Sequence, residues 1–223
     1  MELVKARRLL MSNGPLPPLY KKCDYLQTTG YNSRIDTGVY GDDATLVFDF
    51  DYATIERAAY GAAFGNHVND NTRAWRLINP SSSITRYYYA GAYNRRAGSS
   101  LNVYVVPEGE TFVGKRVNFH MSVGSVTATY GDFSYTATSE ADTTTAISTR
   151  NIAIGSGSPT QSGSNALVGR FWHFKIWSQN ELIRNYIPCV RMSDNKPGFY
   201  DIVNNTFNPS IGTVDFIAGY DTV

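Results

Sequence analysis

The apolar residues of the segment 169–207 recur with period two, and this pattern restricts the fold more than any other feature of the chain. At the start of the segment two sets of side chains alternate, as they do on the two faces of a β-strand. One set is Phe171, His173, Lys175 and Trp177, and the other, which we expect to face the core, is Trp172, Phe174 and Ile176. A shorter apolar run over 182–189 and a strand pattern over 199–203 follow. The segment therefore predicts a meander of short strands.

The same alternation occurs upstream, most clearly over residues 45–52. There we expect Leu46, Phe48 and Phe50 in the core and Asp49 and Asp51 on the outer side. Further strand patterns, separated by turns rich in Gly, Asn and Ser, cover 23–28, 34–38, 59–64, 73–78, 85–89, 101–106, 117–123, 125–130, 133–138 and 152–154. The 16 tyrosines and 11 phenylalanines also favour strands over helices. We predict an all-β fold, a two-sheet antiparallel β-sandwich of the jelly-roll kind.

The first 22 residues differ in pattern and are predicted to form an N-terminal arm, with the sandwich domain over 23–223. Apolar residues follow a helical spacing up to Met11, and the Pro-rich segment 15–18 predicts an extended spacer. Five basic residues and one acid give the arm +4, which leaves about −3 for the domain out of the total of +1. We expect the arm to attach to another subunit or protein, although it could also fold back on its own sandwich. The expected contact residues are Leu3, Arg7, Arg8, Leu10, Pro17 and Leu19.

Several motifs at the two ends of the predicted domain are similar to those of a known family. They are Y-L-Q-T-T-G from Tyr25, R-I-D-T-G from Arg34, G-R-x-x-x-F-K-I from Gly169, L-I-R-x-x-I-P-C from Leu182 and G-x-Y-D-x-V-x-x-x-F from Gly198. They resemble the laminin-G-like, or concanavalin A-like, jelly-roll domains found in structural proteins of gut bacteriophages and prophages. The resemblance extends from residue 23 to residue 219 and leaves the arm outside it.

This resemblance implies a non-catalytic component of a phage virion, associated with the capsid or belonging to a head fibre or tail. Such a protein would be made in the host cytoplasm, would bind other virion proteins through its arm and would form a homo-oligomer in the virion. Because one fold serves many functions, two alternatives stay open: a carbohydrate-binding adhesin module and a glycan-cleaving enzyme. The net charge of +1 and the lack of an apolar run near ~20 residues predict neither direct sequence-specific nucleic-acid binding nor a membrane span.

Glycan cleavage requires two carboxyl groups about 5–9 Å apart across a groove. The sequence offers Glu108 and Glu110 in a turn, and Asp49 and Asp51 on one outer strand face. Both pairs have the pattern of solvated surface acids, because exposed carboxylates are the ordinary case. We therefore expect no catalytic residues, no cofactor and no enzyme activity.

Metal and disulfide chemistry have equally little support in the sequence. The three histidines lack metal-ligand spacing. The calcium candidates Asp42, Asp43 and Asp70, with Asn69 and Asn71 beside Asp70, are interpreted as turn residues. The two cysteines, Cys23 and Cys189, are expected to be buried thiols, although the first and last strands of such a sandwich could bring them close.

Aromatic residues provide the last candidate site. The runs 86–89 and 93–96 combine tyrosine with arginine, as sugar-binding surfaces and protein interfaces do. Alternation along a strand places Tyr87 and Tyr89 on one face and Tyr88 on the other, so one of these sides can be core. The candidate glycan or interface surface is Tyr87, Tyr88, Tyr89, Tyr93 and Arg95.

Overall fold

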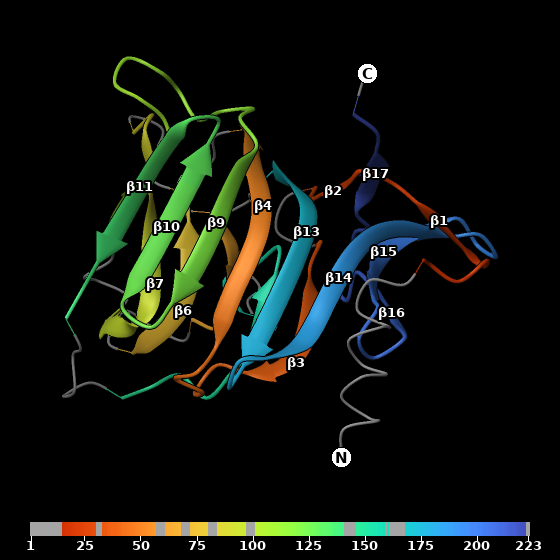
Figure 1. The fold of residues 1–223 in the computed structure, drawn as a ribbon. Helices are drawn as coiled ribbons and strands as arrows, with labels where there is room; N and C mark the ends of the chain where they lie inside the picture. The colour runs from red at the N-terminus through yellow and green to blue at the C-terminus, as the bar shows by residue number, and fades with distance from the viewer. Residues whose placement is uncertain are drawn as a thin grey trace.

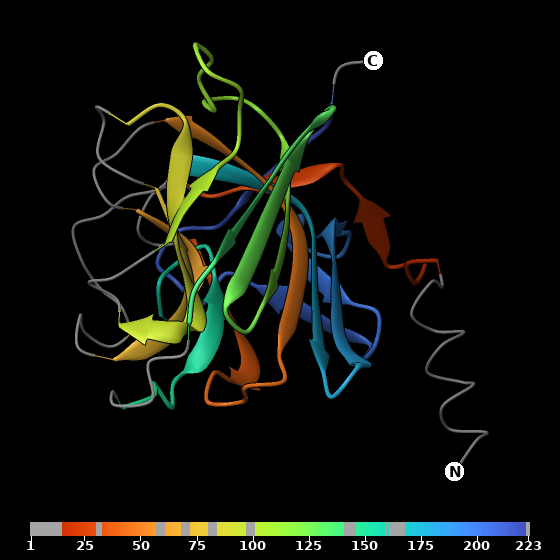
Figure 2. The ribbon, with the colours of Figure 1, turned by 60° about the vertical axis from the view of Figure 1, so that its left-hand side comes forward.

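The computed structural model describes residues 15–29, 33–56, 61–67, 72–79, 84–96, 101–140, 146–158, 160 and 168–221. Throughout these residues the chain forms strands and turns, and none of them lies in a helix. Two antiparallel sheets pack face to face (Figures 1 and 2). The structure therefore confirms the predicted all-β, two-sheet sandwich.

The larger sheet has 11 strands, and eight of them follow one another in the order β11-β10-β9-β4-β13-β14-β15-β16. The other three join at the side, because β1 pairs with β14 and β2 pairs with both β13 and β17. The strands are β1 (Tyr20–Lys22), β2 (Tyr25–Gln27), β4 (Val47–Glu56), β9 (Val117–Ser122), β10 (Ser125–Tyr130), β11 (Phe133–Thr138), β13 (Val168–Ser178), β14 (Glu181–Arg191), β15 (Lys196–Asp201), β16 (Thr206–Pro209) and β17 (Ile217–Gly219).

The smaller sheet has six strands in the order β3-β12-β5-β6-β7-β8. They are β3 (Ile35–Tyr40), β5 (Ala62–Gly65), β6 (Arg73–Ile78), β7 (Tyr87–Arg96), β8 (Leu101–Tyr104) and β12 (Asn151–Ile154). Neighbouring strands such as β3 and β12 are far apart in the sequence. The sandwich therefore combines hairpins of consecutive strands, such as β6 with β7, with pairings between strands that are distant in the sequence.

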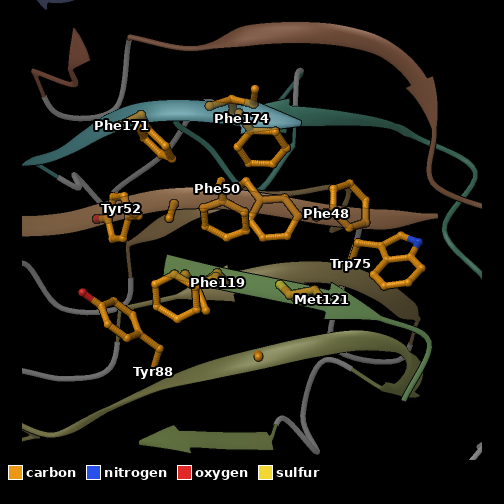
Figure 3. Packing of buried hydrophobic residues seen from close by; sticks show 14 of the residues in the cluster. Phe48, Phe50, Tyr52, Trp75, Tyr88, Phe119, Met121, Phe171 and Phe174 are labelled. Atoms are coloured by element: carbon orange, nitrogen blue, oxygen red, sulfur yellow. The ribbon is translucent and has the colours of Figure 1, made fainter. Parts of the chain in front are cut away.

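Aromatic rings from both sheets fill the space between them (Figure 3). The ring of Phe50 on β4 stacks on Phe119 of β9 at 5.3 Å and on Phe174 of β13 at 4.7 Å, measured between ring centroids. From the smaller sheet, Trp75 lies 5.0 Å from Phe48. The predicted core residues of β4 are thus confirmed, because the alternation of that strand continues without interruption.

A β-bulge in β13 changes the face on which one predicted core residue lies. The pairing of β13 with β4 shifts register between Phe171 and His173. One extra residue in a strand exchanges its two faces, so Phe171 and Phe174 both point into the core, as does Ile176. Trp172 stays only half-buried. The prediction was right for Phe174 and Ile176 and wrong for Trp172.

A second hydrophobic cluster lies on the opposite face of the larger sheet, over β14 to β16. Phe199 on β15 belongs to the main core, and its neighbour Tyr200 belongs to this second cluster, because adjacent strand residues face opposite sides. The cluster comprises the buried Cys189, Tyr200 and Ile202 and the partly buried Leu16, Tyr20, Ile187 and Phe207. Residues from the N-terminal segment therefore help to cover the sheet.

The described part of the predicted arm, residues 15–22, is joined to the sandwich. The sheet begins at Tyr20, whose backbone pairs with Arg191, and the Tyr20 N–H donates to the Pro17 carbonyl at 2.9 Å. Residues 15–17 have no regular secondary structure, and a turn at Pro18 and Leu19 ends the extended spacer that we expected over 15–18. Leu16 and Tyr20 contact the second cluster. The sheet thus starts before the predicted domain boundary at residue 23.

Candidate functional site

A group of half-exposed tyrosines gathers at one edge of the sandwich. On β7 the alternation buries Tyr88 and directs Tyr87 and Tyr89 outward, with their ring centroids 5.6 Å apart. Tyr104 on β8 is paired with Tyr87 in the sheet, and their rings are 5.3 Å apart. Tyr135 from β11 of the larger sheet lies 5.1 Å from the Tyr104 ring. We call Tyr87, Tyr89, Tyr104 and Tyr135 the tyrosine cluster.

Arg86 adds a positive charge to the tyrosine cluster. Its guanidinium lies over the Tyr104 ring at 5.3 Å, and its Nη1 is 3.9 Å from Oε1 of Glu108, a side chain that is 93% exposed. Partly exposed rings offer both an apolar face and a hydroxyl, which suits contacts with a sugar ring or with another protein surface. The cluster can therefore bind by stacking and hydrogen bonding, and it has the composition of an interface rather than of an acid–base site.

The structure corrects two members of the predicted tyrosine surface, Tyr88 and Tyr93. Tyr88 is fully buried, and its hydroxyl shares a hydrogen bond of 2.8 Å with Thr54 Oγ1. Tyr93 is also buried, because β7 changes register beside Arg73 and Tyr93 adopts a positive φ of 66°, which turns its ring onto Trp75. The side chain of Arg95 lies outside the described residues. Of the four predicted tyrosines, Tyr87 and Tyr89 are partly exposed, as we expected.

Sequence reasoning missed Tyr104 and Tyr135. These residues lie 17 and 48 positions beyond Tyr87, from the numbering of the chain, and fold topology alone brings them together. The alternation of 101–106 could have marked Tyr104 as an outward residue, whereas Tyr135 lies on the inner face of β11 and packs partly against the core. Neither pattern identifies a neighbour.

A polar cluster occupies the outer face of the larger sheet at β4, β9 and β13. His173 lies between the two carboxylates of β4, with Nε2 at 2.9 Å from Asp49 Oδ1 and Nδ1 at 3.7 Å from Asp51 Oδ2. Asp51 also accepts hydrogen bonds from Arg116 Nε at 2.8 Å and Asn118 Nδ2 at 2.9 Å. Both predicted outward carboxylates are therefore held by partners on neighbouring strands.

The electrostatics of this polar cluster favour ionised carboxylates. Partial burial by itself raises the pKa of the Asp49 carboxyl, but the hydrogen bond and the charge of His173 outweigh it, with Lys175 and His120 contributing, and the pKa falls below its ordinary value. A general acid needs a raised pKa so that it carries a proton near neutral pH. Asp49 is thus suited to ion pairing and unsuited to donating a proton.

Next to the polar cluster, an aromatic and guanidinium row continues along the same sheet. The Arg116 guanidinium lies 4.9 Å from the Trp172 ring, Trp172 lies 5.5 Å from Tyr25, and the Arg170 guanidinium lies 4.3 Å from Tyr25. The Trp172 Nε1–H donates to Asp221 Oδ2 at 2.8 Å. These contacts hold the Trp172 side chain against the outer face of the sheet, although the bulge directs it away from the core.

The predicted assembly contacts are only partly within the described chain. Leu3, Arg7, Arg8 and Leu10 lie outside it. Leu19 is 68% exposed, and its carbonyl accepts a hydrogen bond from the Met192 N–H at 2.9 Å. Met192 is itself 58% exposed, so two apolar side chains stand close together where the segment meets the sandwich. Pro17 takes part in the turn that precedes β1.

The acidic residues considered for calcium have structural roles where they are described. Asp43 accepts hydrogen bonds from the Thr45 N–H at 2.7 Å and from Ser178 Oγ at 2.6 Å, while the Asp42 carbonyl accepts the Tyr93 hydroxyl at 2.8 Å. Asp70 lies outside the described residues. Within the part of the chain that the structure describes, no group of three or more His, Cys, Asp or Glu side chains converges to hold a metal ion.

Both cysteines are free and buried. They are near each other in the fold, because Lys22 pairs with Cys189 and the Cys23 N–H donates to the Pro188 carbonyl. Burial raises the pKa of each thiol to about 12, with a further contribution from Asp24 for Cys23 and from Cys23 for Cys189. The thiols are therefore held protonated.

Comparison with known proteins finds similarity to solved structures. The sequence matches no protein-family model and no curated protein sequence. Among solved structures, domains LG4-5 of the mouse laminin α1 chain are similar, with a TM-score of 0.48 and 14% identity over 75% of this chain and 44% of that chain. This chain thus spans less than half of the length of that neighbour. The fold class rests on the two antiparallel sheets and their shared core.

Over the part of the chain that the structure describes, no segment forms a helix long and apolar enough to cross a membrane.

Proposed function

We propose that this protein is a non-catalytic structural component of a bacteriophage virion, attached through its N-terminal residues and displaying the sandwich. The observation that carries the proposal is the way the chain enters the fold. β1 is paired with β14, and the Tyr20 ring lies 4.7 Å from Tyr200 and 5.3 Å from Phe207. A virion protein that binds the residues before Pro15 would thereby be connected directly to the sheet, as an attachment segment requires.

The attachment can be tested by removing only the residues that precede the packed segment 15–22. Deletion of residues 2–14 keeps Leu16 and Tyr20 in the second cluster, so we expect unchanged thermal stability together with loss of the protein from purified virions. The matched control is the full chain with Tyr40→Ala, which alters one exposed side chain on β3, outside the arm. Normal incorporation of a folded 2–14 deletion variant would contradict attachment through the arm.

The absence of catalysis is part of the proposal and is supported by the state of the β4 carboxylates. Asp49 and Asp51 are both engaged by positively charged or hydrogen-bonding partners, and the lowered pKa of Asp49 opposes a role as general acid. Incubation of the full chain with polysaccharides should release no reducing sugar. Release that is abolished by Asp49→Asn would favour the glycan-cleaving alternative instead.

A second candidate function, carbohydrate binding, is favoured by the tyrosine cluster. Four partly exposed rings beside Arg86 form a surface on which a sugar could stack. The test is binding to a glycan array by the full chain and by Tyr87→Ala and Tyr104→Ala variants. Tyr40→Ala is the matched control, because Tyr40 on β3 is 65% exposed and lies outside the cluster. Binding that survives loss of the cluster residues would exclude this surface as the glycan site.

A further inference from the structure

The outer strands of the two sheets differ in their protection against pairing with another chain. Natural sheet edges are usually short, charged, interrupted by proline or distorted by a bulge. β1 and β17 have three residues, and β8 and β16 have four. β16 also ends at Pro209, β1 contains Lys21 and Lys22, and β3 changes register with β12. Each of these edges has at least one such feature.

β11 is the exception among the described edge strands. It has six residues, F-S-Y-T-A-T, without charge, proline or glycine, and it pairs with β10 over its whole length without a register shift. Among the described strands its sheet partner is β10 alone, and it lies at the margin of the larger sheet (Figure 1). An edge of this kind is a template for a further strand.

The backbone groups on the open side of β11 can be assigned from its pairing. In an antiparallel pair, every second residue exchanges hydrogen bonds with the partner strand and the residues between direct their groups away. The Ser139 N–H donates to the Gly124 carbonyl at 2.8 Å, which places the odd-numbered residues of β11 on the β10 side. Ser134, Thr136 and Thr138 therefore direct their N–H and C=O groups outward, and all three are exposed.

We infer that β11 pairs antiparallel with β11 of a second copy of this chain, across a two-fold axis at Tyr135. This register places Tyr135 opposite the same residue of the second copy and Ser134 opposite Thr136. Side chains on the core-facing side of β11 then lie beside core-facing side chains of the second copy, and solvent-facing side chains lie beside solvent-facing ones. The outward backbone groups of Ser134 and Thr136 then bond to each other across the axis. The larger sheets of both copies become one continuous sheet.

The side chains of β11 suit this self-pairing on both faces. On the outer face, Thr127 Oγ1 and Thr136 Oγ1 are 2.8 Å apart and Thr129 Oγ1 and Ser134 Oγ are 3.5 Å apart, so a row of hydroxyl pairs already runs along the strand and continues into the second copy. On the inner face, Phe133 and Tyr135 are only half-buried and would gain cover. The strand carries no charge that would repel its copy.

The same pairing brings the two tyrosine clusters together. Tyr135 is the member of the cluster that comes from the larger sheet, and it lies on the proposed axis. The Tyr104 rings of both copies would then flank a common aromatic surface. The inference concerns the oligomer and is independent of whether the protein belongs to a virion.

The first experiment measures the mass of the full chain by sedimentation equilibrium up to several hundred micromolar. We expect a dimer for the natural chain and a monomer for Thr136→Lys, which places a charge on the edge, and for Thr136→Pro, which removes an outward N–H. The matched control is Thr127→Lys on β10, the strand next to β11. It adds the same charge and breaks the same hydroxyl pair but leaves the edge strand unchanged, so it should remain dimeric. Circular dichroism confirms that each variant is folded.

The second experiment tests the register by cross-linking. Directly opposed residues of a non-hydrogen-bonded pair have Cα atoms about 4.5 Å apart, which is within the range of a disulfide. Tyr135→Cys should therefore form a covalent dimer under mild oxidation, whereas Thr138→Cys, about 20 Å from its own copy at ~3.4 Å per residue, should not. The natural cysteines are buried and do not interfere.

Two results would overturn the inference. One is a natural chain that stays monomeric over the whole concentration range. The other is a dimer whose mass is unchanged in folded Thr136→Lys and Thr136→Pro and whose Tyr135→Cys variant does not cross-link.

Discussion

Phe174 and Trp172 are two positions apart on β13 but contribute to the protein in different ways. Phe174 is fully buried between Phe50 and Phe64, so Phe174→Ala should lower the free energy of unfolding by about 3–5 kcal/mol. Trp172 lies on the outer side of the bulge, and Trp172→Ala should lower it by less than about 2 kcal/mol. Urea denaturation of both variants measures the difference. Equal losses would mean that the bulge does not separate the two side chains.

The buried cysteines give a second prediction at this scale. With a pKa of about 12, a thiol is ionised in only about one molecule in ten thousand at pH 8, and the thiolate is the reactive form. Ellman's reagent at pH 8 should therefore leave Cys23 and Cys189 unmodified in the folded chain and modify both after denaturation. Rapid modification of either residue in the folded chain would show that the N-terminal strand opens readily.

Asp49 gives a pH-dependent prediction. Its pKa is lower in the folded chain than in the unfolded chain, so its contribution is complete above the unfolded value of about 4 and is lost as the pH falls through the folded value. Asp49→Asn should therefore cost about 1 kcal/mol at pH 7 and progressively less below pH ~4. Denaturation at several pH values measures this, with Glu108→Gln, an exposed acid, as the control. A constant difference between variant and natural chain would contradict the assigned ion pair.

Residue burial could be predicted from the sequence where strands are regular. Phe48 and Phe50 were placed correctly because β4 alternates without interruption, whereas Trp172 and Tyr93 were not, because a bulge or a positive φ exchanges the faces. Such irregularities depend on the partner strand. The composition of the candidate site had the same limit, since Tyr104 and Tyr135 join Tyr87 only through pairing across the two sheets.

At the scale of elements, the packing of the N-terminal strand β1 predicts different melting temperatures for two truncated chains. Tyr20 packs on Tyr200 and Phe207, and Leu16 covers the same cluster. Deleting residues 2–14 should leave the melting temperature unchanged, whereas deleting 2–22 should lower it by several degrees, because a half-buried ring, Leu16 and the β1–β14 pairing are lost together. Thermal unfolding followed by circular dichroism measures both. If the two variants melt alike, residues 15–22 do not stabilise the sandwich.

Element boundaries were predictable where glycine-containing or other clear turns border long alternating runs. The predicted limits of β10 and β11 agree with the structure residue for residue, since Gly124 and Gly131 have positive φ in the turns before and between them. β1, β16 and β17 were not predicted as separate strands. They have three or four residues each, which is too short for an alternation to be recognised, and they form because longer strands are available to pair with them.

At the scale of the whole molecule, the order of strands could not have been read from the sequence. β4 lies between β9 and β13, and β3 lies beside β12, although these segments are distant in the chain. Pairing order depends on which apolar faces fit across the sandwich, and every regular strand offers a similar face. The alternating strand pattern predicted the class of fold, whereas the contact of the N-terminal segment with the second cluster became visible only in three dimensions.

The last prediction follows from how the two clusters share strands. β15 carries Phe199 in the main core and Tyr200 in the second cluster, and β14 likewise contributes Tyr186 to one and Cys189 to the other. A cluster cannot lose its packing while these strands stay in register, so the domain should unfold in a single cooperative transition. Tyr200→Ala should therefore lower the melting temperature of the whole domain by about 2–4 °C for each kcal/mol lost. Far-UV circular dichroism and tryptophan fluorescence should report the same shift. The control Tyr40→Ala, at an exposed position, should leave the melting temperature unchanged. Two separate transitions in Tyr200→Ala would mean that the β14–β16 region is a unit that folds independently of the sandwich core.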